Sequence, residues 1–353
     1  MSDSQLMHDG LGLLVESTVA ESYASLGKDE RRVSLALDLA QKVRLETHGL
    51  LGEMNESFFL LTQMIEIIWR CGFDFDLRDT TAGPDFYSYP SIHPSVASDA
   101  GLVEDERKRM RLENHEYQTS RFRRLHIELG KRNDGLEVMR MVMFPRARYA
   151  LPILALDMVA INGRVSFVIA DASPVSESKE VPEEYAQAMA ELKRKYFPSK
   201  ASQVDLPDWA TTVLSEGRLC ARPGSPDEVS DFIGYCAELV NFHVEASKCF
   251  GLVRSEETLS EVYRCHQRYA GHQSKNEKTR KILEASFGAN FTDEYMRTTL
   301  FDFECGLYSM PEESDIHFGL AKVRNLQGGT VYVPNSAWTP AEEITMLRLQ
   351  NQV

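Results

Sequence analysis

The sequence predicts an α+β fold in which one central antiparallel sheet is flanked by helices. Apolar and polar residues alternate from residue 111 onward over several consecutive segments, a period typical of strands. Short polar breaks separate these segments, and the break at 161–164 contains Asn162-Gly163, the strongest short hairpin signal. Segments with helix-capping signals then follow. A run of strands followed by a run of helices indicates α+β rather than alternating α/β.

The segments before the sheet are predicted to be helices and a loop. Residues 1–57 are expected to form amphipathic helices, for example over 35–45, and residues 58–72 (FFLLTQMIEIIWRCG) a strongly apolar helix. Gly72 is expected to end that helix, because glycine adopts the left-handed cap conformation at low cost. Residues 73–103 are rich in Pro, Ser, Asp and Gly and predict a long loop.

The sheet is predicted to be an antiparallel meander with helices after it. Its segments are RLENHEYQT, RRLHIELG, VMRMVMF, LPILALDMVA and RVSFVIAD. SPDE (225–228) predicts a helix start, with a serine cap, proline at the first helical position and an acid three residues after the cap. This helix is expected to run to about Lys248. Further helices are predicted over 183–200, from about Ser255 past Gln273, over KTRKILEASFG with Gly288 at its end, and from TPAE (339–342).

Composition excludes several classes of protein. The chain has 353 residues, of which 43% are hydrophobic and 26% charged, an ordinary globular composition. Its six cysteines include no C-x-x-C pair and no zinc-finger spacing, so we expect reduced thiols in a cytosol-like compartment. The start lacks a signal-peptide pattern, and no window approaches the roughly 18 apolar residues of a membrane span. We therefore expect a cytoplasmic protein. The net charge of −14 argues against wide nucleic-acid or membrane surfaces.

Familiar cofactor and nucleophile motifs are missing. The sequence contains no G-x-G-x-x-G fingerprint, no phosphate-binding G-x-x-x-x-G-K-[ST] loop and no G-x-S-x-G elbow. It also lacks H-E-x-x-H and a cysteine set for an iron–sulfur cluster. No metal site is predicted. If the protein is an oxidoreductase, its electrons come from outside.

Charged residues interrupt three of the predicted strands on one face. Because side chains alternate between the faces of a strand, His126 and Glu128 point away from their apolar neighbours, and so do Arg140 and Asp157. If neighbouring strands pair, these four side chains converge on one side of the sheet. Such a titratable cluster is a candidate functional site. The alternative is a sheet face that meets solvent, with Arg140 in an ordinary cross-strand pair with Asp157 or Glu128.

Several segments, taken in order, resemble one enzyme family. They are YQTSRFRRLHIELG, GLEVMRMVMFPRARYALPILALDMVA, VSFVIADASPV, LPDWA and KNEKTRKILEASFGANFTDEYMRTTLFD. Together they resemble the ferredoxin-dependent bilin reductases, most closely the phycocyanobilin:ferredoxin oxidoreductase branch. The resemblance covers about residues 58–303. It implies a bilin reductase domain over 58–303, a helical N-terminal extension at 1–57 and a C-terminal extension at 304–353.

The resemblance implies a fold and an activity. The fold is a three-layer α/β/α sandwich. The activity is reduction of biliverdin IXα to a phytobilin, such as phycocyanobilin, by successive one-electron and proton transfers through bilin radicals. No cofactor is held, and reduced ferredoxin or flavodoxin supplies the electrons. We expect a monomer with no nucleic-acid or membrane partner. The basic segments at 193–195 and 275–281 are candidates for docking acidic ferredoxin.

The resemblance also implies roles for individual residues. Asp157 matches the central proton-donating aspartate, Glu128 the glutamate associated with reduction of the exocyclic vinyl group, and His126 the histidine beside it. A carboxyl held in a nearly apolar pocket has a raised pKa and can carry a proton at neutral pH. Substrate contacts are expected from Asn276, Glu277 and Lys278 in one helix segment, with Lys278 as a propionate partner, and from Ser166 in a propionate-contact position.

Several positions depart from the closest branch, and among them Glu277 stands where that branch usually has aspartate. Arg140, the fourth expected catalytic residue, stands where that branch has histidine. Arginine is no general acid, and it should pull the pKa of Asp157 down. Val204 and Asp205 precede LPDW, where the closest branch has a propionate-binding arginine. Two alternatives therefore stay open: a bilin-binding protein that does not reduce its ligand, and a reductase of another linear tetrapyrrole.

Overall fold

A computed structural model describes most of the central part of the chain. The described residues are 50–73, 76–79, 85–88, 105–198, 204, 206 and 208–301, together with two strands at 320–324 and 330–334. The helices predicted before residue 50 and from 339 onward lie outside these residues. Within the described part of the chain, no helix is both long and apolar enough to cross a lipid bilayer.

The strands form one antiparallel sheet, as predicted. Its order is β1-β3-β4-β5-β6-β7-β8, and β2 also pairs with β3. The strands are β1 (Arg78–Asp79), β2 (Asp85–Ser88), β3 (Met110–Gln118), β4 (Phe122–Arg132), β5 (Leu136–Pro145), β6 (Ile153–Ile161), β7 (Arg164–Ser173) and β8 (Leu219–Ala221). Two of them correct the prediction of a loop over 73–103, because β1 and β2 lie within it. Phe86 and Tyr87 in β2 are good strand formers. Among the described strands, β9 (Leu320–Arg324) and β10 (Thr330–Pro334) pair with each other in a separate two-stranded sheet.

Every helix predicted between residues 58 and 288 is present, and α7 begins at Pro226 as its capping signal predicts. The α-helices are α3 (Glu56–Phe73), α5 (Glu183–Tyr196), α6 (Asp208–Val213), α7 (Pro226–Cys249), α8 (Glu256–Gln273), α9 (Glu277–Phe287) and α10 (Ala289–Tyr295). Short turns of helix are η1 (Leu51–Glu53), η4 (Glu106–Lys108), η5 (Ala147–Tyr149) and η6 (Met296–Leu300).

The structure shows the backbone at three residues that were predicted to start or end helices. Ser225 caps α7 by accepting a hydrogen bond from the backbone N–H of Glu228 at 3.3 Å. Helix α8 starts after Ser255 as predicted but ends at Gln273 rather than beyond it. Gly288 follows α9 with φ +81°, a conformation that glycine adopts without strain.

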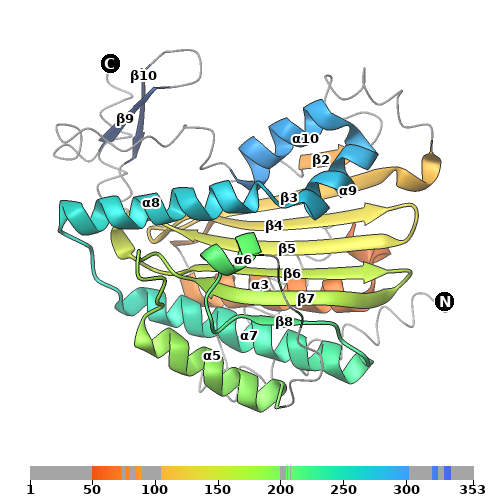
Figure 1. The fold of residues 1–353 in the computed structure, drawn as a ribbon, viewed down its shortest axis with the longest axis horizontal. Helices are drawn as coiled ribbons and strands as arrows, with labels where there is room; N and C mark the ends of the chain where they lie inside the picture. The colour runs from red at the N-terminus through yellow and green to blue at the C-terminus, as the bar shows by residue number, and fades with distance from the viewer. Residues whose placement is uncertain are drawn as a thin grey trace.

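The sheet lies between two layers of helices, which confirms the three-layer sandwich. One apolar core joins one face of the sheet to α3, α5 and α7, and a second joins the opposite face to α6, α8, α9 and α10. Figure 1 shows the long strands β4 to β7 side by side among these helices. The Asn162-Gly163 turn between β6 and β7 has positive φ at both residues, 51° and 74°, as the hairpin signal requires.

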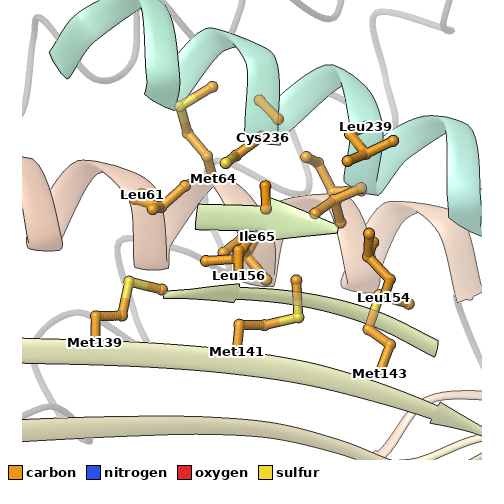
Figure 2. Packing of buried hydrophobic residues seen from close by; sticks show 14 of the residues in the cluster. Leu61, Met64, Ile65, Met139, Met141, Met143, Leu154, Leu156, Cys236 and Leu239 are labelled. Carbon is orange, nitrogen blue, oxygen red and sulfur yellow. The ribbon is translucent and has the colours of Figure 1, made fainter. Parts of the chain in front are cut away.

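The core beneath α3 and α7 is built on alternating residues of the central strands. Figure 2 shows Met139, Met141 and Met143 of β5 and Leu154 and Leu156 of β6 pointing toward these helices. Each of the five is at most 2% exposed. Since full burial of such a side chain stabilises the fold by roughly 1.5–3 kcal/mol, this face anchors the sheet. Arg140 and Asp157 of the same strands point to the opposite face, which also carries the second apolar core.

Gly72 does not end α3, contrary to the prediction, because the helix includes it and extends to Phe73. Its role is to permit close contact with α7. A Cβ added at position 72 would lie 2.3 Å from Cγ1 of Val244, which is fully buried. The glycine is thus required by helix packing and not by a cap.

Gly72→Ala is expected to lower the free energy of unfolding by about 1–3 kcal/mol, the usual cost of overpacking a core. Val244 is buried and β-branched, so it has little freedom to move aside. Denaturant unfolding followed by circular dichroism measures the effect. Gly251→Ala is the matched control, because a Cβ there meets nothing within 4 Å. Equal stability of the two variants would contradict the packing role.

The described residues before α3 pack on the sheet. Leu50 and Leu51 are 0% and 2% exposed within the core, and the backbone N–H of Leu50 donates to Glu113 at 2.9 Å. Residues 50–57 thus contact the sheet, although the prediction assigned them to an N-terminal extension. The boundaries predicted at 57/58 and 303/304 stay predictions.

Candidate functional site

The register of the sheet brings the charged strand residues into one row. Glu128 of β4 pairs directly with Arg140 of β5, and Arg140 pairs directly with Asp157 of β6. Asn114 of β3 lies opposite Glu128 on the other side, and Ile169 of β7 lies opposite Asp157. Directly paired residues in antiparallel strands share a face, so the row crosses the middle of the sheet on the side of α8 and α10. The predicted convergence of Glu128, Arg140 and Asp157 is therefore observed.

The helices cover this face incompletely near β6 and β7. Leu156 and Met158, which point to the opposite face, are 2% and 0% exposed. Between them, the side chain of Asp157 is 39% exposed, and the neighbouring Ala155 and Val159 are also partly exposed. Asp157 is thus accessible from outside although it lies in a central strand. We call this partly exposed area of β6 and β7 the open strip.

Arg140 lies beside the open strip and is itself buried. Its side chain is 8% exposed, and its Nε lies 3.8 Å from Oδ1 of Asp157. Its guanidinium carbon lies 4.6 Å from the centre of the Phe301 ring, a cation–π contact. Tyr269 of α8 also interacts with Arg140, and the positive charge opposes the increase that burial causes in the pKa of Tyr269. Arg140 is therefore held by an acid and two aromatic rings.

Two opposing effects set the pKa of Asp157. Burial raises the pKa above its ordinary value, and the positive charge of Arg140 lowers it by less. The sequence analysis predicted both directions, an increase from an apolar pocket and a decrease from Arg140, but not which effect is larger. Because two-fifths of the side chain is accessible, solvent moderates the increase. Asp157 is placed to take up or release a proton at the open strip.

Glu128 belongs to a buried hydrogen-bond network at the other end of the row. The Tyr295 hydroxyl lies 2.7 Å from Oε1 of Glu128 and 2.9 Å from Oδ1 of Asn114. Glu128 is 6% exposed. Burial raises its pKa, while the Tyr295 hydroxyl and the charge of Arg140 oppose that increase.

His126 joins the same network through Asn114. Its Nε2 lies 2.8 Å from Oδ1 of Asn114, and an amide oxygen only accepts, so Nε2 carries the proton. Burial holds the pKa of His126 well below its usual range, and the charges of Arg124 and Arg140 lower it further. His126 is therefore a neutral donor at physiological pH.

The predicted substrate contacts in α9 lie at its N-terminus. Asn276 caps the helix, with its Oδ1 accepting from the backbone N–H of Lys278 at 3.2 Å. The exposed Glu277 forms an ion pair with Lys281 at 3.3 Å. Lys278 is exposed, and its charge acts on Cys220 of β8, which pairs with Ile169. The row continues from Asp157 through Ile169 to Cys220, and of the three residues Lys278 is the one whose charge acts at that end.

Ser166 lies at an irregularity of β7. The pairing changes register between Val159 and Ala160 of β6, so Ser166 is the extra residue between Val165 and Phe167. Its hydroxyl donates to the carbonyl oxygen of Val159 at 3.3 Å, and the side chain is partly exposed. Ser166 therefore lies next to the open strip.

Four residues that contact the charged row were not predicted from the sequence. They are Asn114 of β3, Tyr269 of α8, Tyr295 of α10 and Phe301, which directly follows η6. Asn114 carries one signal, because it is a polar residue on the same strand face as apolar Leu112. The three aromatic residues carry none, since buried aromatic residues in helices usually just fill the core.

The two basic segments predicted to dock ferredoxin lie on opposite faces of the sheet. Residues 193–195 belong to α5, which packs on the core of α3 and α7, whereas 275–281 leads into α9 on the other core. Lys195 pairs with Glu238, and Arg280 pairs with Asp293. They do not form one continuous basic surface, so docking at either stays a prediction. Within the described residues, no cluster of His, Cys, Asp and Glu could hold a metal ion.

Comparisons with known proteins identify relatives of the chain. The family model described as ferredoxin-dependent bilin reductase matches residues 91–302. The phycocyanobilin:ferredoxin oxidoreductase of Synechococcus sp. is 31% identical over 64% of this chain and 92% of its own length. The enzyme of the same name from Trichodesmium erythraeum is 35% identical over 61% and 86%. Among solved structures, tomato phytochromobilin synthase in complex with biliverdin aligns with a TM-score of 0.49 and 13% identity, covering 66% of this chain and 85% of that one.

Proposed function

Because the chain belongs to the ferredoxin-dependent bilin reductases, we propose that it reduces biliverdin IXα to a phytobilin with electrons from reduced ferredoxin. The observation that carries the proposal is the row of Glu128, Arg140 and Asp157 on three paired strands beside the open strip. A bilin over this strip would contact Asp157, and Glu128 lies two strands away in the same row; burial raises the pKa of both carboxyls. Reduction of a conjugated tetrapyrrole consumes protons as well as electrons, and these carboxyls are suited to supply them.

The electrons are proposed to arrive singly, so that bilin radicals form between proton transfers. No redox cofactor of the protein is invoked, and ferredoxin or flavodoxin is the proposed donor. The protein then contributes binding, orientation and proton delivery. Lys278 and Ser166 are the proposed contacts for the propionate groups, because an ammonium and a hydroxyl both suit a carboxylate. Location in the cytoplasm and a monomeric state remain predictions.

Anaerobic turnover tests the proposed function. Purified full-length protein is mixed with biliverdin IXα and a ferredoxin-reducing system and followed by absorption, and the pigments are then separated by chromatography. We expect loss of biliverdin and formation of a more reduced bilin. An unchanged pigment in a protein that binds it tightly would favour a second candidate function, that of a non-reducing bilin-binding protein.

Arg140 is the observation that favours the second candidate. In the structure it takes the position beside Asp157 and opposes protonation of that acid. Burial nevertheless keeps the net shift of the Asp157 pKa upward. We therefore keep the reductase as the proposal and assign to Arg140 an influence on where the bilin is reduced.

Arg140→His is expected to raise the pKa of Asp157 further, because it removes the charge that lowers this pKa. A protonated donor is lost as pH rises through its pKa, so the alkaline limb of the turnover profile should move to higher pH. The product should also move toward phycocyanobilin. The measurement is turnover against pH with chromatography of the products. Arg132→His is the control, since Arg132 pairs with Asp134 in the turn between β4 and β5. An unchanged profile and product in Arg140→His would contradict the role.

A further inference from the structure

The Tyr295 hydroxyl has two hydrogen-bond neighbours that ordinarily only accept. It lies 2.7 Å from Oε1 of Glu128 and 2.9 Å from Oδ1 of Asn114. A phenol has a single hydroxyl proton, so it donates to one of these oxygens at a time. The second contact is a hydrogen bond only if its partner supplies a proton. An amide oxygen has none to give, whereas a carboxyl has one when protonated.

Asn114 also contacts His126, the third member of the network. Its Oδ1 accepts from Nε2 of His126 at 2.8 Å and has a second lone pair free for the Tyr295 hydroxyl. All three contacts are then satisfied when Glu128 is protonated. Glu128 donates to Tyr295, Tyr295 donates to Asn114, and His126 donates to Asn114. The hydrogen-bond geometry and the burial of Glu128 thus both favour a protonated carboxyl.

The charges around Glu128 agree with that state. Arg140 and Arg124 are the cations that act on it, and Asp157 is the nearby acid. Arg124 forms an ion pair with Glu116, so its charge is balanced without Glu128. Arg140 lies 3.8 Å from Asp157 and lowers the pKa of both carboxyls. At Glu128 burial outweighs that charge, so the net shift of its pKa stays upward.

We propose that Tyr295 is a positioning residue that turns its one hydroxyl proton between Asn114 and Glu128, so that Glu128 holds a proton in the resting protein and releases it on demand. When the carboxyl loses its proton, the tyrosine hydroxyl rotates from the Asn114 oxygen to the new carboxylate. No covalent bond is made or broken at Tyr295, and the proton goes from Glu128 to the acceptor. Glu128 then regains a proton from solvent. The release step rests on the proposed reduction of a bilin, whereas the resting state does not.

The inference predicts the direction of a pKa shift. Tyr295→Phe removes a neutral hydrogen bond from the acid form of Glu128 and a charge-assisted one from its carboxylate. Charge-assisted hydrogen bonds are the stronger kind, so the carboxylate loses more. The pKa of Glu128 should therefore rise in this variant, by about one unit. Glu128 would hold its proton more tightly and turnover would slow.

Infrared titration of the resting protein, without substrate, tests the inference. The carbonyl stretching band of a protonated carboxyl should be present in the wild type and be partly lost in Glu128→Gln, whether or not Asp157 adds a second band. The pH midpoint of the Glu128 band should move up in Tyr295→Phe. Tyr235→Phe is the matched control, because that buried hydroxyl lies in the core on the opposite face and has no hydrogen-bond partner among the described residues.

Two outcomes would overturn the inference. If Glu128→Gln leaves the wild-type band unchanged, Glu128 is not protonated. If the pH midpoint of the Glu128 band in Tyr295→Phe stays the same or falls, Tyr295 does not stabilise the carboxylate form of Glu128. Both readouts are independent of turnover, so they remain interpretable if the protein proves not to reduce bilins. A failure of bilin reduction with the infrared result intact would instead overturn the proposed function.

Discussion

Asp157→Asn is expected to slow bilin reduction by about 10²–10⁴-fold, the usual contribution of a positioned general acid or base. Asparagine keeps the size of the side chain but holds no proton that it can release at neutral pH. Because Asp157 is the carboxyl of the row that is open to the outside, no other described acid of the row replaces it directly. Single-turnover absorption changes with reduced ferredoxin measure the effect, and bilin binding should remain.

Two controls accompany the Asp157 prediction. Asp227→Asn makes the same chemical change at an exposed position in the first turn of α7 and should leave the rate unchanged. Equilibrium binding of biliverdin, measured by its absorption, separates loss of proton delivery from loss of binding. A wild-type rate in Asp157→Asn would contradict the assignment of Asp157 as a proton carrier.

Leu156→Ala is expected to lower the free energy of unfolding by about 2–5 kcal/mol. Leu156 is the residue before Asp157, is 2% exposed and packs on the core beneath α3 and α7. The truncation leaves a cavity in the layer that holds the central strands, so the cost includes lost contacts as well as lost burial. Denaturant unfolding followed by circular dichroism gives the change.

The control for Leu156 lies on the same strand. Ile161 at the end of β6 is 51% exposed, and Ile161→Ala should change the stability by no more than about 0.5 kcal/mol. Similar losses in the two variants would show that the apolar face of β6 does not anchor the sheet. Together with the Asp157 variant, the pair separates the two faces of one strand, one for stability and one for chemistry.

Alternation along the strands predicted most of this arrangement. The pattern placed Met139, Met141 and Met143 on one face and Arg140 on the other, and both placements are observed. Period-two alternation fixes the face of each side chain because a one-residue slip would expose the whole apolar set. Alternation put Glu128, Arg140 and Asp157 on one face, but the register that pairs Glu128 with Arg140 and Arg140 with Asp157 was not predicted.

Contacts between distant segments could not be predicted in the same way. Tyr295 reaches Glu128 across 167 positions of sequence, and only the packing of α10 on the sheet brings them together. Gly72 looked like a helix cap because the local signal for a cap and for a close helix contact is the same residue. The pKa of Asp157 depends on burial, which the sequence shows only as a tendency.

The central claim is that carboxyls on the sheet deliver protons to a bilin that ferredoxin reduces. Its most direct test adds a limiting amount of reduced ferredoxin to the anaerobic biliverdin complexes of the wild type and of Asp157→Asn, followed by absorption and electron paramagnetic resonance. We predict that the wild type proceeds to a more reduced bilin, whereas the variant accumulates a bilin radical that waits for its proton. Equal conversion by both proteins, or no change of the pigment in the wild type, would contradict the claim.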